Sequence, residues 1–195
     1  MKVIGITGGV GSGKTTLLNA IKEKYNCDII LADLIAKKLE QPGMICYEKL
    51  VDLLGERILN ENGFIDVKLM SQAIFADKDI LEEVNNIVHP AVNEYIIDYI
   101  KKAKASGEYD FLFVEAAILT EGGYTDYLDE FWYVYASKDV RIDRLSSGRG
   151  YSYEKSKSII DKQSTDEEYL KRTQFVIDNS GDINNSLKQV AERLL

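Results

Sequence analysis

The stretch Gly8-Gly9-Val10-Gly11-Ser12-Gly13-Lys14-Thr15 decides the fold of this 195-residue chain. It matches the pattern G-x-x-x-x-G-K followed by Ser or Thr, in which glycines let the backbone wrap closely around a phosphate. We expect Lys14 to reach the β- and γ-phosphates, Thr15 to offer its hydroxyl to Mg²⁺, and Thr16 to donate to the α-phosphate. The predicted residues for binding ATP are Gly9, Gly11, Ser12, Gly13, Lys14, Thr15 and Thr16.

An apolar run precedes this loop and a helical pattern follows it, as phosphate binding by a loop and a helix N-terminus requires. Val3–Ile6 is typical of a buried strand, and Thr15–Lys24 has the spacing of an amphipathic helix. Further apolar runs alternate with helical patterns, which indicates a parallel sheet covered on both faces. We therefore expect an α/β fold of the P-loop NTP hydrolase type, a five-stranded parallel sheet flanked by helices. The other predicted strands are Cys27–Leu31, Phe111–Val114, Phe131–Tyr135 and Phe175–Ile177.

Composition limits the function classes. The net charge is −8, and 45% of the residues are hydrophobic and 29% charged. These values suit a globular protein, and the acidic balance argues against general binding to nucleic acid or to anionic membranes. No apolar run approaches the ~20 residues that span a bilayer, no leader is visible, and two cysteines make no disulfide framework. We expect a cytoplasmic protein, a monomer or weak homo-oligomer, with no nucleic-acid or membrane partner.

Two carboxylates follow predicted strands and are candidates for the chemistry. Asp33 comes just after Cys27–Leu31, at the sheet edge where ligands bind in open α/β sheets. It could take the proton from an acceptor hydroxyl, or it could simply cap the helix predicted at Leu34–Glu40. Glu115 ends the strand at Phe111–Val114 and could hold a water bound to Mg²⁺, or it could be a solvated strand-end residue. The residue pattern leaves both choices open.

A cluster of arginines suggests a lid over the phosphates. Arg141, Arg144 and Arg149 fall within nine residues, with the first two on one face of a helix predicted at Lys138–Ser146. Arg149 lies in a predicted break at Ser147–Gly150. Arginines delivered by a mobile segment can stabilise the charge on a phosphoryl group in transfer, and we favour this role for Arg144 and Arg149. The alternative is an ordinary solvated helix.

Several motifs, taken in order, resemble those of the dephospho-coenzyme A kinase family. Any one of them is modest, but the ordered set spans almost the whole chain. They include the single histidine, which alone would be read as structural rather than catalytic. The matching segments are Ile4–Thr16, Ile29–Ala36, Pro42-Gly43, Phe75-Ala76, His89-Pro90, Glu115–Glu121, Arg141–Arg149, Gln163 and Val176–Gly181.

This resemblance implies transfer of the ATP γ-phosphate to the ribose 3′-hydroxyl of dephospho-CoA. It implies Asp33 as general base, with Lys14, Arg144 and Arg149 as the other catalytic residues. It also implies acceptor contacts at Thr7, Asp33 and His89, and places Asn179 and Gly181 near the adenine of ATP. It divides the single domain into a core of about residues 1–58, 108–140 and 164–195, a helical acceptor-binding region at about 59–107, and a lid at about 141–163.

The sequence departs from the family pattern in the acceptor and adenine regions. The family's Asp-Ala-Asp is Leu31-Ala32-Asp33 here, and its Val-Pro is Ala116-Ala117. A family lysine aligns with Tyr169, and a family aspartate with Gln174. Three alternatives therefore stay open: another small-molecule kinase of the same fold, a P-loop switch or ATPase with a protein partner, and a family member that has lost its kinase activity.

Overall fold

The structure, a computed structural model, describes residues 1–75, 78–116 and 123–195. The described chain forms two compact units. The first holds Met1–Ile30 and the chain from Lys102 onward, apart from Gly123 and Tyr124. The second holds Leu31–Lys101 with those two residues, and the predicted division into core, acceptor-binding region and lid stays a prediction.

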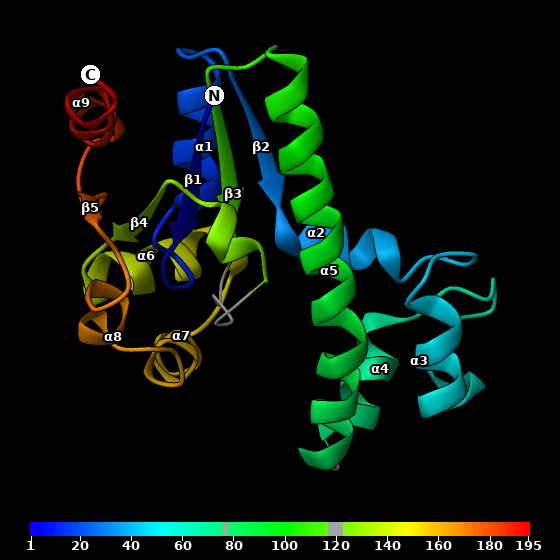
Figure 1. The fold of residues 1–195 in the computed structure, drawn as a ribbon. Coiled ribbons are helices and arrows are strands. Elements are labelled where there is room, and N and C mark those ends of the chain that lie inside the picture. Colours follow the sequence, from blue (N-terminus) through cyan, green and yellow to red (C-terminus); the bar gives the residue numbers. More distant parts are fainter. Residues whose placement is uncertain (76–77, 117–122) are drawn as a thin grey trace. The chain divides into compact units, whose positions relative to one another are not determined.

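A five-stranded parallel sheet forms the centre of the first unit (Figure 1). The strand order is β2-β3-β1-β4-β5, and the pairings β1–β3, β1–β4 and β4–β5 are parallel. The register pairs Ile6 with Glu115 and Thr7 with Tyr133, so the carboxyl ends of β3 and β4 lie beside the start of the glycine loop. All five strands were predicted from the apolar runs, and the fold class is confirmed. Their bounds are β1 Lys2–Thr7, β2 Cys27–Leu31, β3 Phe111–Glu115, β4 Glu130–Tyr135 and β5 Phe175–Asp178.

Helices flank this sheet because each has an apolar face to bury. Leu17, Leu18 and Ile21 are buried on α1, which starts directly after the glycine loop. Helix α9 contacts both α1 and β5, and α6 packs on α7. The sequence analysis missed α8, although Thr165 and Glu168 form a capping box at its start. The bounds are α1 Lys14–Lys22, α6 Lys138–Arg149, α7 Tyr153–Asp161, α8 Asp166–Leu170 and α9 Ile183–Leu194, with the 3-10 helix η2 at Gly123–Tyr127.

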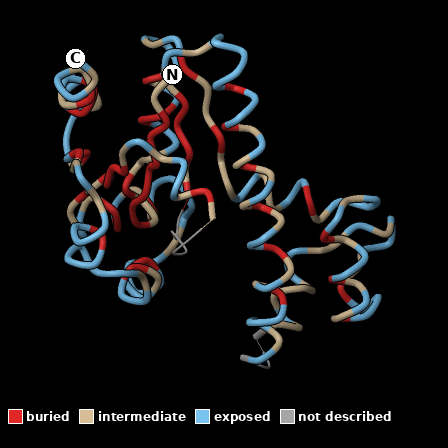
Figure 2. The backbone as a smooth tube through the Cα atoms, viewed as in Figure 1, coloured by how far each residue is buried: buried red, intermediate tan, exposed pale blue. Residues whose placement is uncertain are grey.

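The core of the first unit lies within the sheet and under its helices (Figure 2). An aromatic series crosses three strands: the rings of Phe113 and Trp132 lie 5.9 Å apart, and those of Trp132 and Phe175 lie 5.2 Å apart, both edge to face. Such pairs add to the stabilisation from burial alone. These ring contacts run across the sheet from β3 to β5, whose carboxyl ends carry the loops of the site.

The second unit is helical. Its buried residues include Leu39, Cys46, Leu50, Ile58 and Ile96. Pro90 was expected to start or kink a helix, and the structure places it inside one continuous helix, α5. None of the helices in the described ranges combines the length and apolarity needed to cross a membrane. The helices are α2 Ala32–Leu39, α3 Tyr47–Leu54, η1 Glu56–Ile58, α4 Val67–Phe75 and α5 Lys78–Ser106.

Candidate active site

The glycine loop has the backbone form that phosphate binding requires. Gly11 and Gly13 have φ values of 79° and 87°, in the left-handed region that favours glycine. The Lys14 ammonium folds back over the loop and donates to the carbonyl oxygens of Gly8 at 2.8 Å and Gly9 at 3.4 Å. Helix α1 begins at Lys14, so its N-terminal N–H groups and its dipole face the same loop. This arrangement can bind the phosphates of a nucleotide.

Close neighbours explain why glycines occupy two further positions of the loop. A Cβ at Gly9 would lie 2.2 Å from Nη2 of Arg141, and one at Gly8 would lie 2.5 Å from the backbone oxygen of Val134. Since real Cβ atoms do not approach so closely, an alanine at Gly8 would have to move the end of β4. These glycines fit the loop against its surroundings, in addition to leaving space for a ligand.

A carboxylate lies beside the lysine and threonine of the loop. Glu115 Oε2 accepts a hydrogen bond from the Thr15 hydroxyl at 3.2 Å, and Oε1 lies 3.9 Å from the Lys14 ammonium. The side chain of Glu115 is only 16% exposed. Of the two readings left open, the structure favours a site residue over a solvated strand end. A hydroxyl and a carboxylate at this spacing are the oxygen donors that suit Mg²⁺.

Arg144, predicted as a lid arginine, donates to backbone oxygens around the loop. Its guanidinium lies 3.1 Å from the Ser12 oxygen and 2.8 Å from the Asn179 oxygen. The Asn179 amide also donates to the Ser12 oxygen, at 2.7 Å, and Asn179 is 2% exposed. Hydrogen bonds therefore join the middle of α6, the residue after β5 and the loop in one network.

Arg149 lies elsewhere than the sequence suggested. The predicted break at Ser147–Gly150 is wrong, because α6 continues through Gly148 and Arg149 and ends only at Gly150, where φ is 64°. Gly148 is helical, so only Gly150 interrupts the helix in this stretch. The Arg149 side chain is exposed. Its predicted catalytic role stays a prediction.

The other predicted nucleotide-binding and acceptor residues of the first unit vary in exposure. Thr7 and Ser12 are buried, whereas Thr16 and Gly181 are exposed. Within the described residues, the Ser12 hydroxyl is buried without a hydrogen-bond partner. A buried hydroxyl without a partner lowers the stability of the fold. Such unfavourable groups are expected at functional sites, and the Ser12 hydroxyl lies in the glycine loop.

Two predicted acceptor residues, Asp33 and His89, belong to the second unit. Asp33 was expected as a possible helix N-cap, and this expectation is wrong: α2 starts at Ala32, two residues before the predicted start at Leu34, its N-cap is Leu31, and no side chain makes a capping hydrogen bond. Asp33 lies in the first turn of α2 with its side chain exposed, two residues after β2 ends. His89 is exposed on α5. The prediction of Asp33 as a base no longer competes with a capping role.

The sequence analysis missed the contribution of Arg141 and gave no role to Gln163. Arg141 donates to the Val10 oxygen at 2.8 Å and to Gln163 Oε1 at 2.6 Å. The same Gln163 oxygen accepts from the Val10 N–H at 2.9 Å. Both residues are far from the loop in sequence, so only their inclusion in the family motifs could have drawn attention to them.

Two of the departures from the family pattern have structural roles. Tyr169 stacks on Tyr133 with ring centroids 4.7 Å apart, and Tyr133 donates to Asp166 at 2.6 Å. Burial, together with this hydrogen bond, raises the pKa of Tyr133 well above its usual range. Gln174 accepts from the Phe131 N–H at 2.7 Å, as a carboxylate could. Other quoted motif residues, namely Ala76, Ala117 and Glu121, lie outside the described residues.

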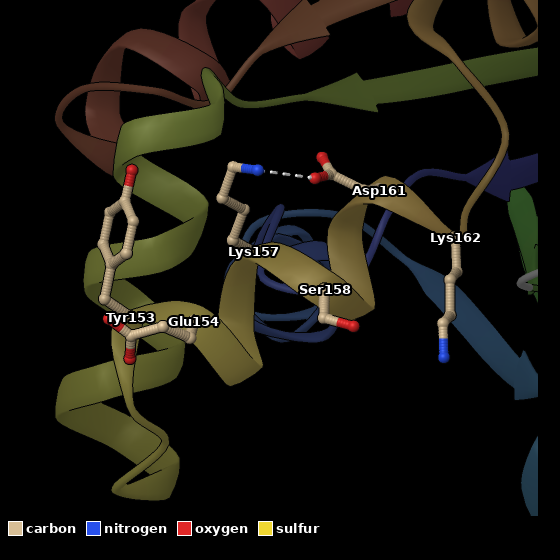
Figure 3. A pocket seen from close by; sticks show the side chains of 6 residues that line it. All are labelled: Tyr153, Glu154, Lys157, Ser158, Asp161 and Lys162. Atoms are coloured by element: carbon tan, nitrogen blue, oxygen red, sulfur yellow. Dashed lines mark ion pairs between the residues drawn. The ribbon is translucent and has the colours of Figure 1, made fainter.

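A separate hollow of about 460 Å³ lies on α7 (Figure 3). It contains none of the predicted site residues, and Lys157 pairs with Asp161 at 3.2 Å. The lining holds two acidic and two basic side chains, so its charges balance. The lining residues are Tyr153, Glu154, Lys157, Ser158, Asp161 and Lys162.

The sheet order, the glycine loop, the lysine and threonine at the start of α1 and the glutamate at the end of β3 define the fold of a P-loop kinase. Solved structures have the same fold. A crystal structure of a Thermus thermophilus protein is 26% identical with a TM-score of 0.80, covering 100% of this chain and 98% of that one. Dephospho-CoA kinase from Campylobacter jejuni is 23% identical with a TM-score of 0.71, covering 100% and 96%.

Sequence comparison identifies the family. The dephospho-CoA kinase family profile matches residues 2–185. The dephospho-CoA kinase of Carboxydothermus hydrogenoformans is 35% identical over 190 residues, which cover 97% of this chain and 91% of the relative. That of Geobacter sulfurreducens is 34% identical, covering 93% and 91%. The chain belongs to the dephospho-CoA kinase family, whose members are ATP-dependent kinases, and the predicted family is confirmed.

Proposed function

We propose that this chain transfers the γ-phosphate of ATP to the ribose 3′-hydroxyl of dephospho-CoA, giving ADP and coenzyme A. The observation that carries the proposal is the family match over residues 2–185, which includes a complete phosphate loop and Asp33. In the transfer, the acceptor oxygen forms a bond to the γ-phosphorus, the bond from that phosphorus to the ADP oxygen breaks, and the hydroxyl proton leaves to a base.

Within the first unit, the loop binds the triphosphate. Lys14 is already aimed across the loop, where it donates to the Gly8 oxygen at 2.8 Å, and it would exchange this bond for the β- and γ-phosphates. Thr15 and Glu115 would hold Mg²⁺ directly or through water. When bound, this ion neutralises phosphate charge that develops in the transfer.

Asp33 is the proposed base. Its exposed carboxylate makes no capping hydrogen bond on α2, so it is available to accept the proton of the acceptor hydroxyl. His89 and Thr7 are proposed to contact the acceptor. The role of His89 follows from the family resemblance, since an isolated exposed histidine carries no such meaning by itself.

Arg144 and Arg149 are proposed to stabilise the transferring phosphoryl group. Arg144 donates to neutral backbone oxygens beside the loop, and an anionic phosphate oxygen would be a stronger acceptor than these. Arg149, at the exposed end of α6, would have to approach the nucleotide when it binds. Asn179 and Gly181 are proposed near the adenine. Cytoplasmic location, a monomeric or weakly oligomeric state and the absence of nucleic-acid partners stay predictions.

The test is coupled release of ADP from Mg-ATP, with dephospho-CoA, AMP, CMP or adenosine each supplied as the sole acceptor. We expect strong stimulation by dephospho-CoA alone, and coenzyme A as the product by mass spectrometry. Stimulation by AMP, CMP or adenosine instead would refute the acceptor while keeping the ATP site. Slow ATP turnover that no acceptor changes would refute the kinase assignment.

A further inference from the structure

Val10, at the centre of the glycine loop, has both backbone polar groups bound by side chains from the distant α6–α7 region. Its carbonyl oxygen accepts from Arg141 Nε at 2.8 Å, and its N–H donates to Gln163 Oε1 at 2.9 Å. The two side chains are joined to each other by the Arg141 Nη2 to Gln163 Oε1 bond of 2.6 Å. Three hydrogen bonds therefore close a ring around one peptide segment of the loop.

The arginine of this ring is buried and depends on neutral partners. Arg141 is only 5% exposed, and in the described part of the chain no carboxylate forms an ion pair with it. A buried cation is costly unless hydrogen bonds satisfy it, so the oxygens of Val10 and Gln163 are needed to hold it in place. Its guanidinium lies against Gly9, and its backbone oxygen lies against Gly11, which leaves no space for side chains there.

The side chain of Val10 adds an apolar contact to the same region. It packs against the small core formed by Ile142 and Leu145 of α6 and Ile160 of α7. Gln163 follows α7 by two residues, and Arg141 lies in the first turns of α6. Arg141 in α6 and Gln163 just after α7 therefore both bind the loop at the same residue, Val10.

We propose that Arg141 and Gln163 are positioning residues for the nucleotide, which act through Val10 and hold the loop in the form that receives phosphate. This inference rests on the proposed function only in taking the loop as a nucleotide site. A loop whose N–H groups are fixed before binding loses less conformational entropy when it closes around phosphate. Loss of the ring therefore weakens nucleotide binding and changes the chemical step much less.

The experiment measures the Kd of ADP with Mg²⁺ by titration calorimetry, for the full chain and its variants, without any acceptor. Gln163→Leu removes the oxygen shared by both donors, and Arg141→Lys keeps the charge but cannot span Val10 and Gln163 together. We expect each single variant to raise the Kd of ADP about tenfold. The Kd of the double variant should exceed the higher of the two single-variant values by no more than about twofold, because both substitutions break the same ring. Gln163→Glu keeps the shared acceptor and should stay within about threefold of the wild type.

A matched control is Gln174→Leu, which removes a side-chain acceptor from a backbone N–H, that of Phe131, away from the loop. It should leave Kd unchanged. The kcat of the two ring variants at saturating substrates should stay within about threefold, which separates positioning from chemistry. If Gln163→Leu does not fold, Gln163→Asn, whose shorter amide cannot reach both donors, takes its place.

Wild-type affinity in both ring variants would overturn the proposal. So would Gln163→Glu binding as weakly as Gln163→Leu, multiplicative losses in the double variant, or an equal loss in Gln174→Leu. These results are independent of the acceptor. A wild type that binds ADP but does not phosphorylate dephospho-CoA would refute the proposed function and leave the test of the ring intact.

Discussion

The hydroxyl of Thr15 lies 3.2 Å from a carboxylate oxygen of Glu115, although the two residues are 100 positions apart in the sequence. The parallel pairing of β1 with β3 sets this distance, because it places Ile6 opposite Glu115 at the carboxyl ends of the two strands. The first turn of α1 and the end of β3 thereby present a hydroxyl and a carboxylate to one point beside the loop. A hydroxyl and a carboxylate are oxygen ligands of the kind that bind a divalent cation together with a nucleotide.

Glu115→Gln should therefore weaken the dependence of nucleotide binding on Mg²⁺. The amide keeps the size of the side chain and can still contact Thr15, but it lacks the charge that attracts the cation. We expect the affinity for ADP to fall about tenfold in the presence of Mg²⁺ and to stay nearly unchanged in EDTA. Calorimetric titrations with and without the ion measure both values.

The control for this variant is Glu108→Gln, which changes an exposed glutamate just before β3. It should bind ADP like the wild type under both conditions. Equal losses with Mg²⁺ and with EDTA in Glu115→Gln would show that Glu115 supports the loop itself and does not act through a cation.

Lys14→Ala should disable phosphoryl transfer. The ammonium crosses the loop to the Gly8 oxygen, and no other lysine of the loop or of the first turn of α1 can replace its charge. Loss of one such group costs about 10²–10³ in rate in comparable sites, and we expect a fall in kcat/KM of that order. The control is Lys22→Ala, at the other end of α1, where the lysine forms an ion pair with Asp28 near the surface. It should leave kcat/KM nearly unchanged. Near-normal turnover by Lys14→Ala would refute the role of the glycine loop in phosphoryl transfer.

Asp33→Asn should lower kcat by about 10²–10⁴ and leave the affinity for ADP unchanged, because it removes a base and no nucleotide contact. The structure adds a second expectation. Since Asp33 makes no capping hydrogen bond on α2, the Tm should change little. Steady-state kinetics and a thermal melt measure the two effects. Asp52→Asn, an exposed aspartate of α3, is the control for the second unit. A normal kcat in Asp33→Asn would exclude Asp33 as the general base.

Features encoded by neighbouring residues could be predicted from the sequence. The strand before the glycine loop and the helix after it follow from apolar spacing, and the five strands were found within one or two residues. Local signals also failed where two of them competed. Ser147–Gly150 has the composition of a break, yet Gly148 stays helical because the helix can tolerate one glycine and Gly150 ends it.

Contacts between distant segments could not be predicted from local pattern. Arg141 and Val10 are 131 positions apart, and Gln163 and Val10 are 153 apart. Spacing along a helix shows that Arg141 and Arg144 share a face, but not that the face meets a loop. Asp33 illustrates the converse case: aspartate is a favoured N-cap, but here the start of α2 directly after β2 places it inside the first turn.

The last prediction concerns Glu130, which ties the C-terminal helix to the sheet. Its carboxylate accepts from Lys2 and Trp132, each at 2.6 Å, and from Arg193 of α9 at 2.9 Å. Burial alone would raise the pKa of Glu130, but the hydrogen bonds from these three donors together hold it below the ordinary value of 4.5. The folded state therefore binds a proton at Glu130 less readily than the unfolded state does.

The sign of the pH effect follows from this difference. The stabilisation by Glu130 is fully present above the unfolded pKa, near 4.5, and is lost as the pH falls through the lower folded value. At pH 7, Glu130→Gln should lower the free energy of unfolding, measured by urea denaturation, by about 1–3 kcal/mol. As the pH falls below 5, the free energy of unfolding should decrease less in this variant than in the wild type. Glu192→Gln, an exposed change on α9, should match the wild type at every pH. If the urea midpoints of Glu130→Gln and the wild type fall by the same amount below pH 5, the pH effect does not come from Glu130, and the assignment of the lowered pKa to this residue is contradicted.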